Sequence, residues 1–161
     1  MKRILTLALA SALALPALAH AEKGSPLWLR HQQISPDGSQ IAFCYKGDIY
    51  TVPTAGGQAL RLTSNAAYDG TPIWSPDSRS LAFSSDREGS KDVYIVKADG
   101  SGLRRLTYSS EKEVPVAFLD GSTSFLMSRM VCIPGTGSYR PTRLTYLRLL
   151  PAPSSTVLIL C

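Results

Sequence analysis

The segment ISPDGSQIAF at residues 34–43 returns forty positions later as WSPDSRSLAF at residues 74–83. Each copy places a Ser-Pro-Asp triplet before a short apolar run that ends in Ala-Phe. Proline fixes φ at the first central position of a turn, and aspartate accepts hydrogen bonds from nearby backbone amides. Each copy is therefore predicted to form a turn that leads into a β-strand. Gly38 follows the first triplet and suits a left-handed conformation, which Ser78 adopts less readily in the second copy.

The two copies continue to match beyond the turn. Each contains an Asp-x-Tyr strand, at 48–50 and 92–94, and each closes on Arg-Leu-Thr, at 61–63 and 105–107. A period of about 40–45 residues built from short strands is typical of β-propeller blades. Tyr50 and Tyr94 could face a ligand, but their equivalent positions favour packing between blades. The residues that define the repeat, all with structural roles expected, are Ser35, Pro36, Asp37, Gly38, Asp48, Tyr50, Arg61, Leu62, Thr63, Ser75, Pro76, Asp77, Asp92, Tyr94, Arg105, Leu106 and Thr107.

These repeats predict an all-β protein made of four-stranded propeller blades. The blades are expected at about residues 31–63 and 71–107, with the start of a third at 114–128. Outside the first 21 residues, no segment has the 3.6-residue periodicity of a long helix. Closed propellers have about 4–8 blades, so these blades form an incomplete ring. Repeats of this kind stabilise one another through their faces.

The first 21 residues have the pattern of a secretory signal peptide. Lys2 and Arg3 precede an apolar run from Ile4 to Leu18, and Ala19-His20-Ala21 provides a small-x-small cleavage signal. The alternative is a short membrane anchor, but a bilayer span takes about 20 apolar residues. We expect a secreted chain that begins near Glu22, most simply in a bacterial periplasm.

The net positive charge of the chain comes from its two ends. The formal net charge is +5, yet residues 22–128 hold eleven Lys and Arg against twelve Asp and Glu. The remaining basic residues are two in the leader and four in residues 129–161. Nucleic-acid binding requires a basic face, and the repeats offer none. The charge pattern therefore argues against a nucleic-acid partner.

The composition changes at residue 129. The last 33 residues contain four Arg but no Lys and no acid, and they end in LRLLPAPSSTVLILC. We expect residues 129–161 to be an aberrant or degenerate tail, such as a shifted reading frame produces. The alternative is a compressed third blade, because Arg143-Leu144-Thr145 repeats the closing motif. No turn residues separate FLMS from RMVCIP, which weighs against that alternative.

Catalytic and metal-binding residues are not predicted. His31 is the one histidine after the leader, no G-x-S-x-G motif is present, and a histidine beside a turn is usually structural. Asp86, Glu88, Ser90 and Asp92 alternate as calcium ligands sometimes do, but Lys97 stands where the loop would need a glutamate. We therefore expect a solvated hairpin loop there, no metal and no cofactor. Cys44, in the apolar run IAFCY, is expected to be a small buried residue.

The motifs SPDG, D-I-Y and R-L-T resemble the Pro-Asp variety of WD-like propeller repeats found in TolB, tricorn-type proteases and prolyl oligopeptidases. The stretches PLWLRHQQISPDG and YKGDIYTVPTAGG are most similar to the N-terminal propeller of periplasmic tricorn-like serine peptidases. The resemblance covers roughly residues 25–128. It implies a non-catalytic fragment that admits or holds peptides for a catalytic domain or further blades of a longer parent. A TolB-like module that binds envelope proteins is the alternative.

Overall fold

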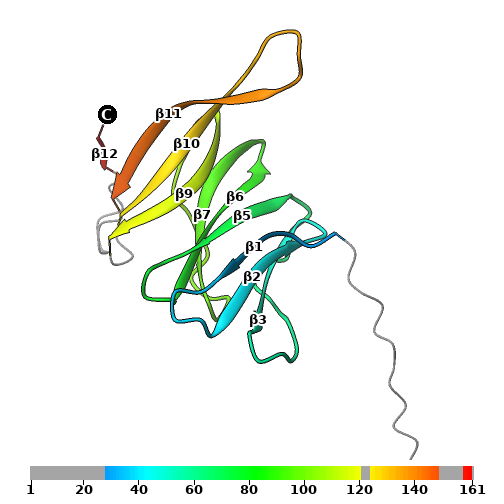
Figure 1. The fold of residues 1–161 in the computed structure, drawn as a ribbon. Coiled ribbons are helices and arrows are strands. Elements are labelled where there is room, and N and C mark those ends of the chain that lie inside the picture. Colours follow the sequence, from blue (N-terminus) through cyan, green and yellow to red (C-terminus); the bar gives the residue numbers. More distant parts are fainter. Residues whose placement is uncertain (1–27, 121–123, 149–157, 161) are drawn as a thin grey trace, which may run out of the picture.

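The computed structural model describes residues 28–120, 124–148 and 158–160. These residues form three four-stranded antiparallel sheets, each an up-and-down meander in sequence order, and contain no helix. Figure 1 shows the sheets fanned out side by side, as expected for propeller blades. No helix in these ranges is long and apolar enough to cross a membrane. The predicted leader lies outside the described residues.

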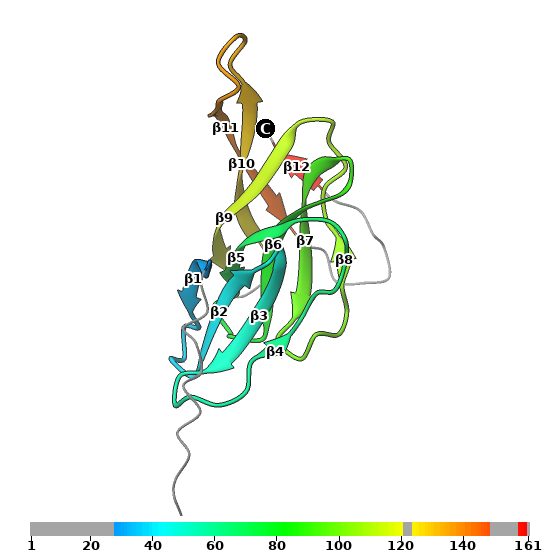
Figure 2. The same ribbon diagram turned by 90° about the vertical axis from the view of Figure 1, so that its right-hand side faces the viewer.

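We call the sheets blades 1, 2 and 3. Blade 1 consists of β1 (Arg30–Ile34), β2 (Gln40–Tyr45), β3 (Asp48–Pro53) and β4 (Leu60–Arg61). Blade 2 consists of β5 (Asp69–Trp74), β6 (Ser80–Glu88), β7 (Ser90–Lys97) and β8 (Arg104–Arg105). Blade 3 consists of β9 (Lys112–Asp120), β10 (Ser124–Cys132), β11 (Tyr139–Arg148) and β12 (Leu158–Leu160). Figures 1 and 2 both show blade 2 between the other two blades, and the ring is not closed by the described residues.

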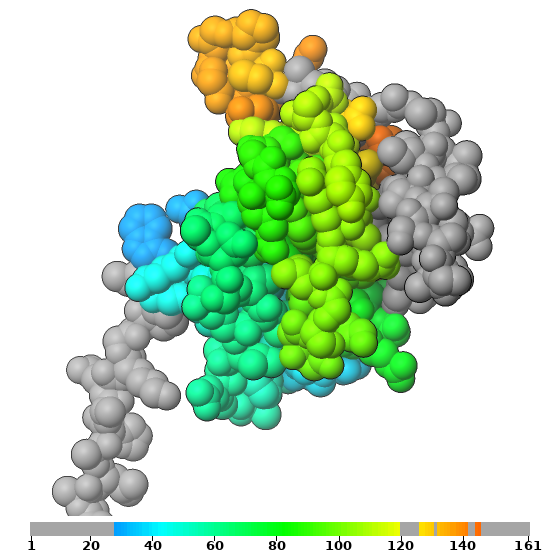
Figure 3. Space-filling model, turned by 180° about the vertical axis from the view of Figure 1, so that it is seen from behind, coloured from blue at the N-terminus to red at the C-terminus, as the bar shows by residue number. Residues whose placement is uncertain are grey.

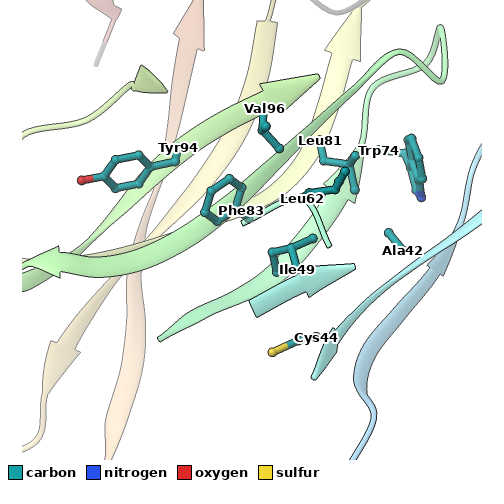
Figure 4. Packing of buried hydrophobic residues seen from close by; sticks show 9 residues of the cluster. All are labelled: Ala42, Cys44, Ile49, Leu62, Trp74, Leu81, Phe83, Tyr94 and Val96. Atoms are coloured by element: carbon teal, nitrogen blue, oxygen red, sulfur yellow. The ribbon is translucent and has the colours of Figure 1, made fainter. Parts of the chain in front are cut away.

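The core between blades 1 and 2 forms because successive strand residues point to opposite faces of a sheet. Blade 1 contributes one face of its sheet, with Ala42, Cys44, Ile49 and Leu62. Blade 2 covers that face with larger side chains, namely Trp74, Leu81, Phe83, Tyr94 and Val96. Figure 4 shows the two sets pointing toward one another. Cys44 is buried here, in the role that the sequence predicts.

Blade 2 is covered on both faces. Its second face consists of Ile73, Ala82, Val93, Ile95 and Leu106. Met127 of β10 packs against this face, and Phe118 of β9 supports it at the edge. The middle strands β6 and β7 are consequently buried almost continuously, whereas β2 of blade 1 alternates between buried and half-exposed residues.

Blade 3 extends through the region where an aberrant tail is expected. Because β10 runs without interruption from Ser124 to Cys132, FLMS and the RMVC that follows it belong to one strand and need no turn between them. The turn lies later, where the amide of Ile133 donates to the carbonyl of Ser138 at 2.9 Å. This hairpin stands out from the blades at one end of the molecule (Figure 3). The arrangement is that of the alternative, a third blade, while the origin of residues 129–161 stays a prediction.

The third Arg-Leu-Thr does not repeat the role of the first two. Arg143-Leu144-Thr145 lies on β11, the third strand of its sheet, and not on a short outer strand. Its leucine is 62% exposed, whereas Leu62 and Leu106 are buried in the cores. The recurrence of this triplet in blade 3 is therefore not structurally equivalent to the closing motif.

Candidate functional site

The Ser-Pro-Asp triplets form identical hydrogen-bonded turns. In blade 1 the Ser35 hydroxyl donates to Oδ1 of Asp37 at 2.5 Å and accepts from the amide of Gln40 at 2.9 Å. In blade 2 the corresponding Ser75 hydroxyl donates to Asp77 at 2.6 Å and accepts from the amide of Ser80 at 2.9 Å. These contacts close the turn between the first and second strands of each blade, so both triplets have a structural role.

The residue after each triplet has a left-handed backbone conformation. Gly38 has φ 73° and Ser78 has φ 59°, which is a strained conformation for serine. The Ser78 hydroxyl also accepts a hydrogen bond at 3.1 Å from the amide of Asp37, in the neighbouring blade. Hydrogen bonds from Ser35 and Ser39 lower the pKa of Asp37 to about 2. The turns of blades 1 and 2 are thus joined at one end of the molecule.

The Asp-x-Tyr and Arg-Leu-Thr motifs fasten the outer strand of each blade. In blade 2, Arg105 forms an ion pair with Asp92 at 2.7 Å and donates through Nε to the carbonyl of Thr107. The Thr107 hydroxyl accepts from the buried amide of Val93 at 2.9 Å. Two-residue strands such as β4 and β8 have few ladder hydrogen bonds, so these side chains hold them in place.

Blade 1 repeats this arrangement. Asp48 pairs with Arg61 at 2.6 Å, and the Thr63 hydroxyl accepts from the amide of Ile49 at 3.0 Å. Tyr50 and Tyr94 pair across strands with the two arginines, and their rings stack on Phe43 and Phe83. Tyr94 lies in the core between blades. The serines and aspartates of the triplets thus lie in turns and the Asp, Arg and Thr of the other motifs in outer-strand contacts, whereas Tyr50, unlike Tyr94, lies outside the core between the blades. The structural role of the repeat residues stays a prediction.

The side chains that resemble calcium ligands in the sequence do not point toward a common position. Oδ1 of Asp86 accepts from the amide of Tyr68, the Ser90 hydroxyl donates to the carbonyl of Ser109, and Asp92 is held by Arg105. Gly89, at φ 98°, closes the tight turn between β6 and β7. Within the described ranges no group of three or more His, Cys, Asp or Glu is arranged to hold a metal ion.

Ion pairs of Arg87 and Arg129 are not found by comparing the repeats. Arg87 donates to both carboxylate oxygens of the fully buried Asp69 at 3.0 Å, with its guanidinium 4.5 Å from the Tyr94 ring centroid. In blade 3, Arg129 pairs with the buried Glu113 and with the more exposed Glu111, each at 2.9 Å. The pairs with Asp69 and Glu113 link the first strand of a blade to its second strand. A signal exists in the sequence, since FSSDR and FLMSR both end in arginine, but the acids lie on another strand at different spacing.

A hollow with several polar groups lies where the first strands of the three blades meet. The hollow, of about 210 Å³, is lined by His31, Gln32, Gln33, Thr71, Pro72, Ile73, Pro115 and Val116. The lining comes from β1, β5 and β9. Strand β5 lies in the middle and contacts both β1 and β9. In a propeller these strands surround the central channel. The hollow is therefore the part of that channel that the three blades form.

Strained backbone marks the same hollow in two blades. His31 has φ 54° and Thr71, forty residues later, has φ 49°. Each lies at a register shift in its strand, which re-aims the neighbouring side chains. Left-handed non-glycine residues are uncommon and concentrate at functional sites. The sequence did not predict these left-handed conformations, because the residue types at positions 31 and 71 do not indicate them.

The electrostatics of the hollow favour neutral polar contacts. Partial burial lowers the pKa of His31, and the positive charges of Lys91 and Arg30 lower it further. The imidazole is therefore neutral at pH 7 and offers one donor and one acceptor. The two adjacent glutamines add amide donors and acceptors, while Pro72, Ile73 and Val116 add apolar surface. Such a mixture suits backbone amides and uncharged side chains of a peptide.

Comparison with known proteins places this geometry in a family. The family model described as the tricorn protease N-terminal β-propeller domain matches residues 26–146. The chain belongs to this family. The match includes β10 and most of β11, beyond the point where the composition changes. The family model describes a propeller domain and not a peptidase domain.

Individual relatives agree with this family membership. The chain is 30% identical over 87 residues to tricorn protease homolog 1 of Streptomyces coelicolor, which is 54% of this chain and 8% of that protein. A putative TolB from Agrobacterium tumefaciens has the same fold, with a TM-score of 0.64 and 22% identity over 84% of this chain and 50% of its own. The tricorn protease crystal structure gives a TM-score of 0.57 and 14% identity, over 78% of this chain and 14% of its own. The chain thus spans a small part of the curated relative.

Proposed function

We propose that this chain is a non-catalytic part of an N-terminal propeller that binds peptides and passes them to a peptidase domain. The observation that carries the proposal is the hollow at the first strands, where His31, Gln32 and Gln33 offer neutral hydrogen-bonding groups beside strained backbone. Its position on three blades would let an extended peptide enter along the channel. The relative named a tricorn protease homolog supports a role beside proteolysis.

The test is peptide binding by the full chain. The probe is a set of fluorescein-labelled, unstructured, uncharged peptides of about ten residues, measured by fluorescence anisotropy. Gln32→Ala should weaken binding by about threefold to tenfold, the loss of one or two hydrogen bonds. Gln58→Ala is the matched control, because Gln58 is an exposed glutamine in the loop between β3 and β4, away from the hollow. Equal binding by both variants, or no binding by the wild type, would reject the hollow as a peptide site.

A TolB-like module that docks envelope proteins is the second candidate. The putative TolB is a solved structure of which the chain matches half the length, and its name mentions no peptidase. The two candidates differ in what a longer parent would contain. Sequencing the encoding DNA through codon 128 and beyond the stop, in all three frames, distinguishes them. A peptidase region in any frame supports the first candidate, and a frame with further repeats that simply end supports the second.

The proposed location is the bacterial periplasm. The basis is the leader pattern of residues 1–21, with its two basic residues, apolar run and small-x-small ending. Fractionation of a bacterial host that expresses the full chain tests this proposal. Export should leave a periplasmic product whose N-terminal sequence begins at Glu22, whereas a retained leader or a cytosolic product would argue against secretion.

A further inference from the structure

Blade 1 carries an apolar face that no described residue covers. The hollow on this face has a volume of about 420 Å³ and is lined by Leu29, Phe43, Tyr45, Tyr50, Val52 and Ala59. Ile34, on the same side of the sheet through its pairing with Ile41, is 65% exposed. Figure 1 shows no other labelled strand on the far side of blade 1 from blade 2.

Blade 2 shows what covers such a face. Its residues at the equivalent repeat positions are Trp74, Leu81, Phe83, Tyr94 and Val96, which correspond to Ile34, Ile41, Phe43, Tyr50 and Val52. Trp74 is only 6% exposed and Phe83 is fully buried, because both pack on the opposite face of blade 1. The occupant of the open face is therefore another blade, which presents the face that bears smaller side chains.

Among the described residues of blade 3, part of a face of that second kind is exposed. Met127 points into the core with blade 2, so β10 and β11 residues of the other parity point away from it. On that far side Leu144 of β11 is 62% exposed, while its cross-strand partner Ser128 is 6% exposed. Ala117 of β9, paired with Leu126, is exposed there as well. One chain thus carries both halves of a blade junction, at its two ends.

We propose that two copies of this chain close into one six-bladed ring. Each copy packs the open face of its blade 3 on the open face of blade 1 of the other copy. Two sets of three blades give a ring within the range of about 4–8 blades that closed propellers have. A head-to-tail contact of this kind forms a ring when its rotation closes. This inference concerns assembly and does not depend on peptide binding.

The first test is the mass of the full chain in solution, measured by size-exclusion chromatography with multi-angle light scattering from about 1 to 100 µM. The expected result is a dimer. A monomer at all concentrations would overturn the proposal and leave the face to further blades of a longer chain. Open-ended oligomers that grow with concentration would also overturn it, since the contact would then not close.

Substitutions at exposed positions test the two faces separately. Ile34→Lys and Leu144→Glu should each weaken the dimer by at least about 100-fold, because each places a charge in an apolar junction. Both residues are more than half exposed in the single chain, so its own fold should survive, as far-ultraviolet circular dichroism can check. Leu103→Lys, at an exposed leucine before β8, is the control and should leave the dimer intact. An unchanged dimer in either test variant would contradict the proposed junction.

Mixing the two variants tests whether the open face of blade 1 meets the open face of blade 3. A heterodimer of Ile34→Lys and Leu144→Glu has one wild-type junction and one junction with a lysine and a glutamate on opposing faces. Each homodimer has two altered junctions. The mixture should therefore recover dimer that neither variant forms alone. Failure of the mixture to recover any dimer would show that the two faces do not meet each other.

Discussion

Blades 1 and 2 contain the same motif residues in different surroundings. Phe83 is fully buried and Trp74 nearly so, while their counterparts in blade 1, Phe43 and Ile34, are half-buried and exposed. The order of the strands, the serine-aspartate turn and the ion pair to the outer strand nevertheless follow the same pattern in both blades. The local motif therefore determines the blade, and the neighbouring blades determine how much each residue contributes to stability.

The same difference is visible in polar contacts. Asp92 is fully buried and accepts hydrogen bonds from Arg105 and from the amide of Ser109. Asp48 pairs with the more exposed Arg61, and its Oδ1 has no partner among the described residues. A repeat can thus preserve a motif while the free energy that it contributes varies from blade to blade.

The largest expected difference is at the phenylalanine of the second strand. Phe83→Ala should lower the free energy of unfolding by about 3–5 kcal/mol, because it leaves a cavity in the core. Phe43→Ala should cost about 1 kcal/mol or less in dilute solution, where its face is open. Urea unfolding of the two variants measures both values. Equal losses would contradict the difference in burial, and a Phe43→Ala loss that grows with protein concentration would support ring closure.

The buried ion pair gives the next effect. Asp92→Ala should cost about 3 kcal/mol, because it leaves Arg105 without its partner in a mostly buried site. Asp48→Ala should cost about 1 kcal/mol, because Arg61 is nearly half exposed and water can replace the carboxylate. Chemical denaturation of both variants checks the order. A larger loss at Asp48 than at Asp92 would refute the ranking of the two blades.

The turns of blades 1 and 2 should differ in stability because a glycine in the first turn is replaced by a strained serine in the second. Gly38→Ser should cost about 1 kcal/mol, since Gly38 has φ 73° and no atom within 4 Å of an added Cβ, so only backbone strain opposes the change. Ser78→Gly should stabilise by less than this, because relief of strain is offset by the lost hydrogen bond to Asp37. Thermal unfolding measures both. Stabilisation by Gly38→Ser would contradict the assigned turn conformation.

The smallest expected effect is a dependence on pH. The pKa of Asp37 is lowered from 3.8 to about 2 by its serine hydrogen bonds, so its contribution is fully present above pH 4 and is lost as the pH falls toward 2. Asp37→Asn should therefore flatten the loss of stability between about pH 4 and pH 2. Unfolding curves at a series of pH values test this. If wild type and variant lose the same stability between pH 4 and pH 2, Asp37 is not the cause of that loss.

Much of blades 1 and 2 is predictable because their motifs are local. The triplet at Ser35–Asp37 predicts a turn, QIAFCY predicts β2, and DIYTVP predicts β3. The burial of Cys44 also follows from its apolar neighbours. These features depend on residues close together in the chain, where turn chemistry and strand propensity are strong guides.

Blade 3 and the channel hollow are less predictable for physical reasons. The third unit lacks the proline of the triplet, and β10 runs through the point where the composition changes at Arg129. The pair between Arg129 and Glu113 joins residues on different strands, so no spacing rule reveals it. The left-handed conformations of His31 and Thr71 arise from register shifts between strands, which the residue types do not signal.

Amide hydrogen exchange of the full chain, at a concentration where it is monomeric, tests the central claim most directly. The claim is that blades with equivalent motifs differ in stability because only blade 2 is covered on both faces. The predicted result is slowest exchange in β6 and β7, with β2 and β3 exchanging markedly faster. Equal protection of the two blades, or slower exchange in blade 1, would contradict the account.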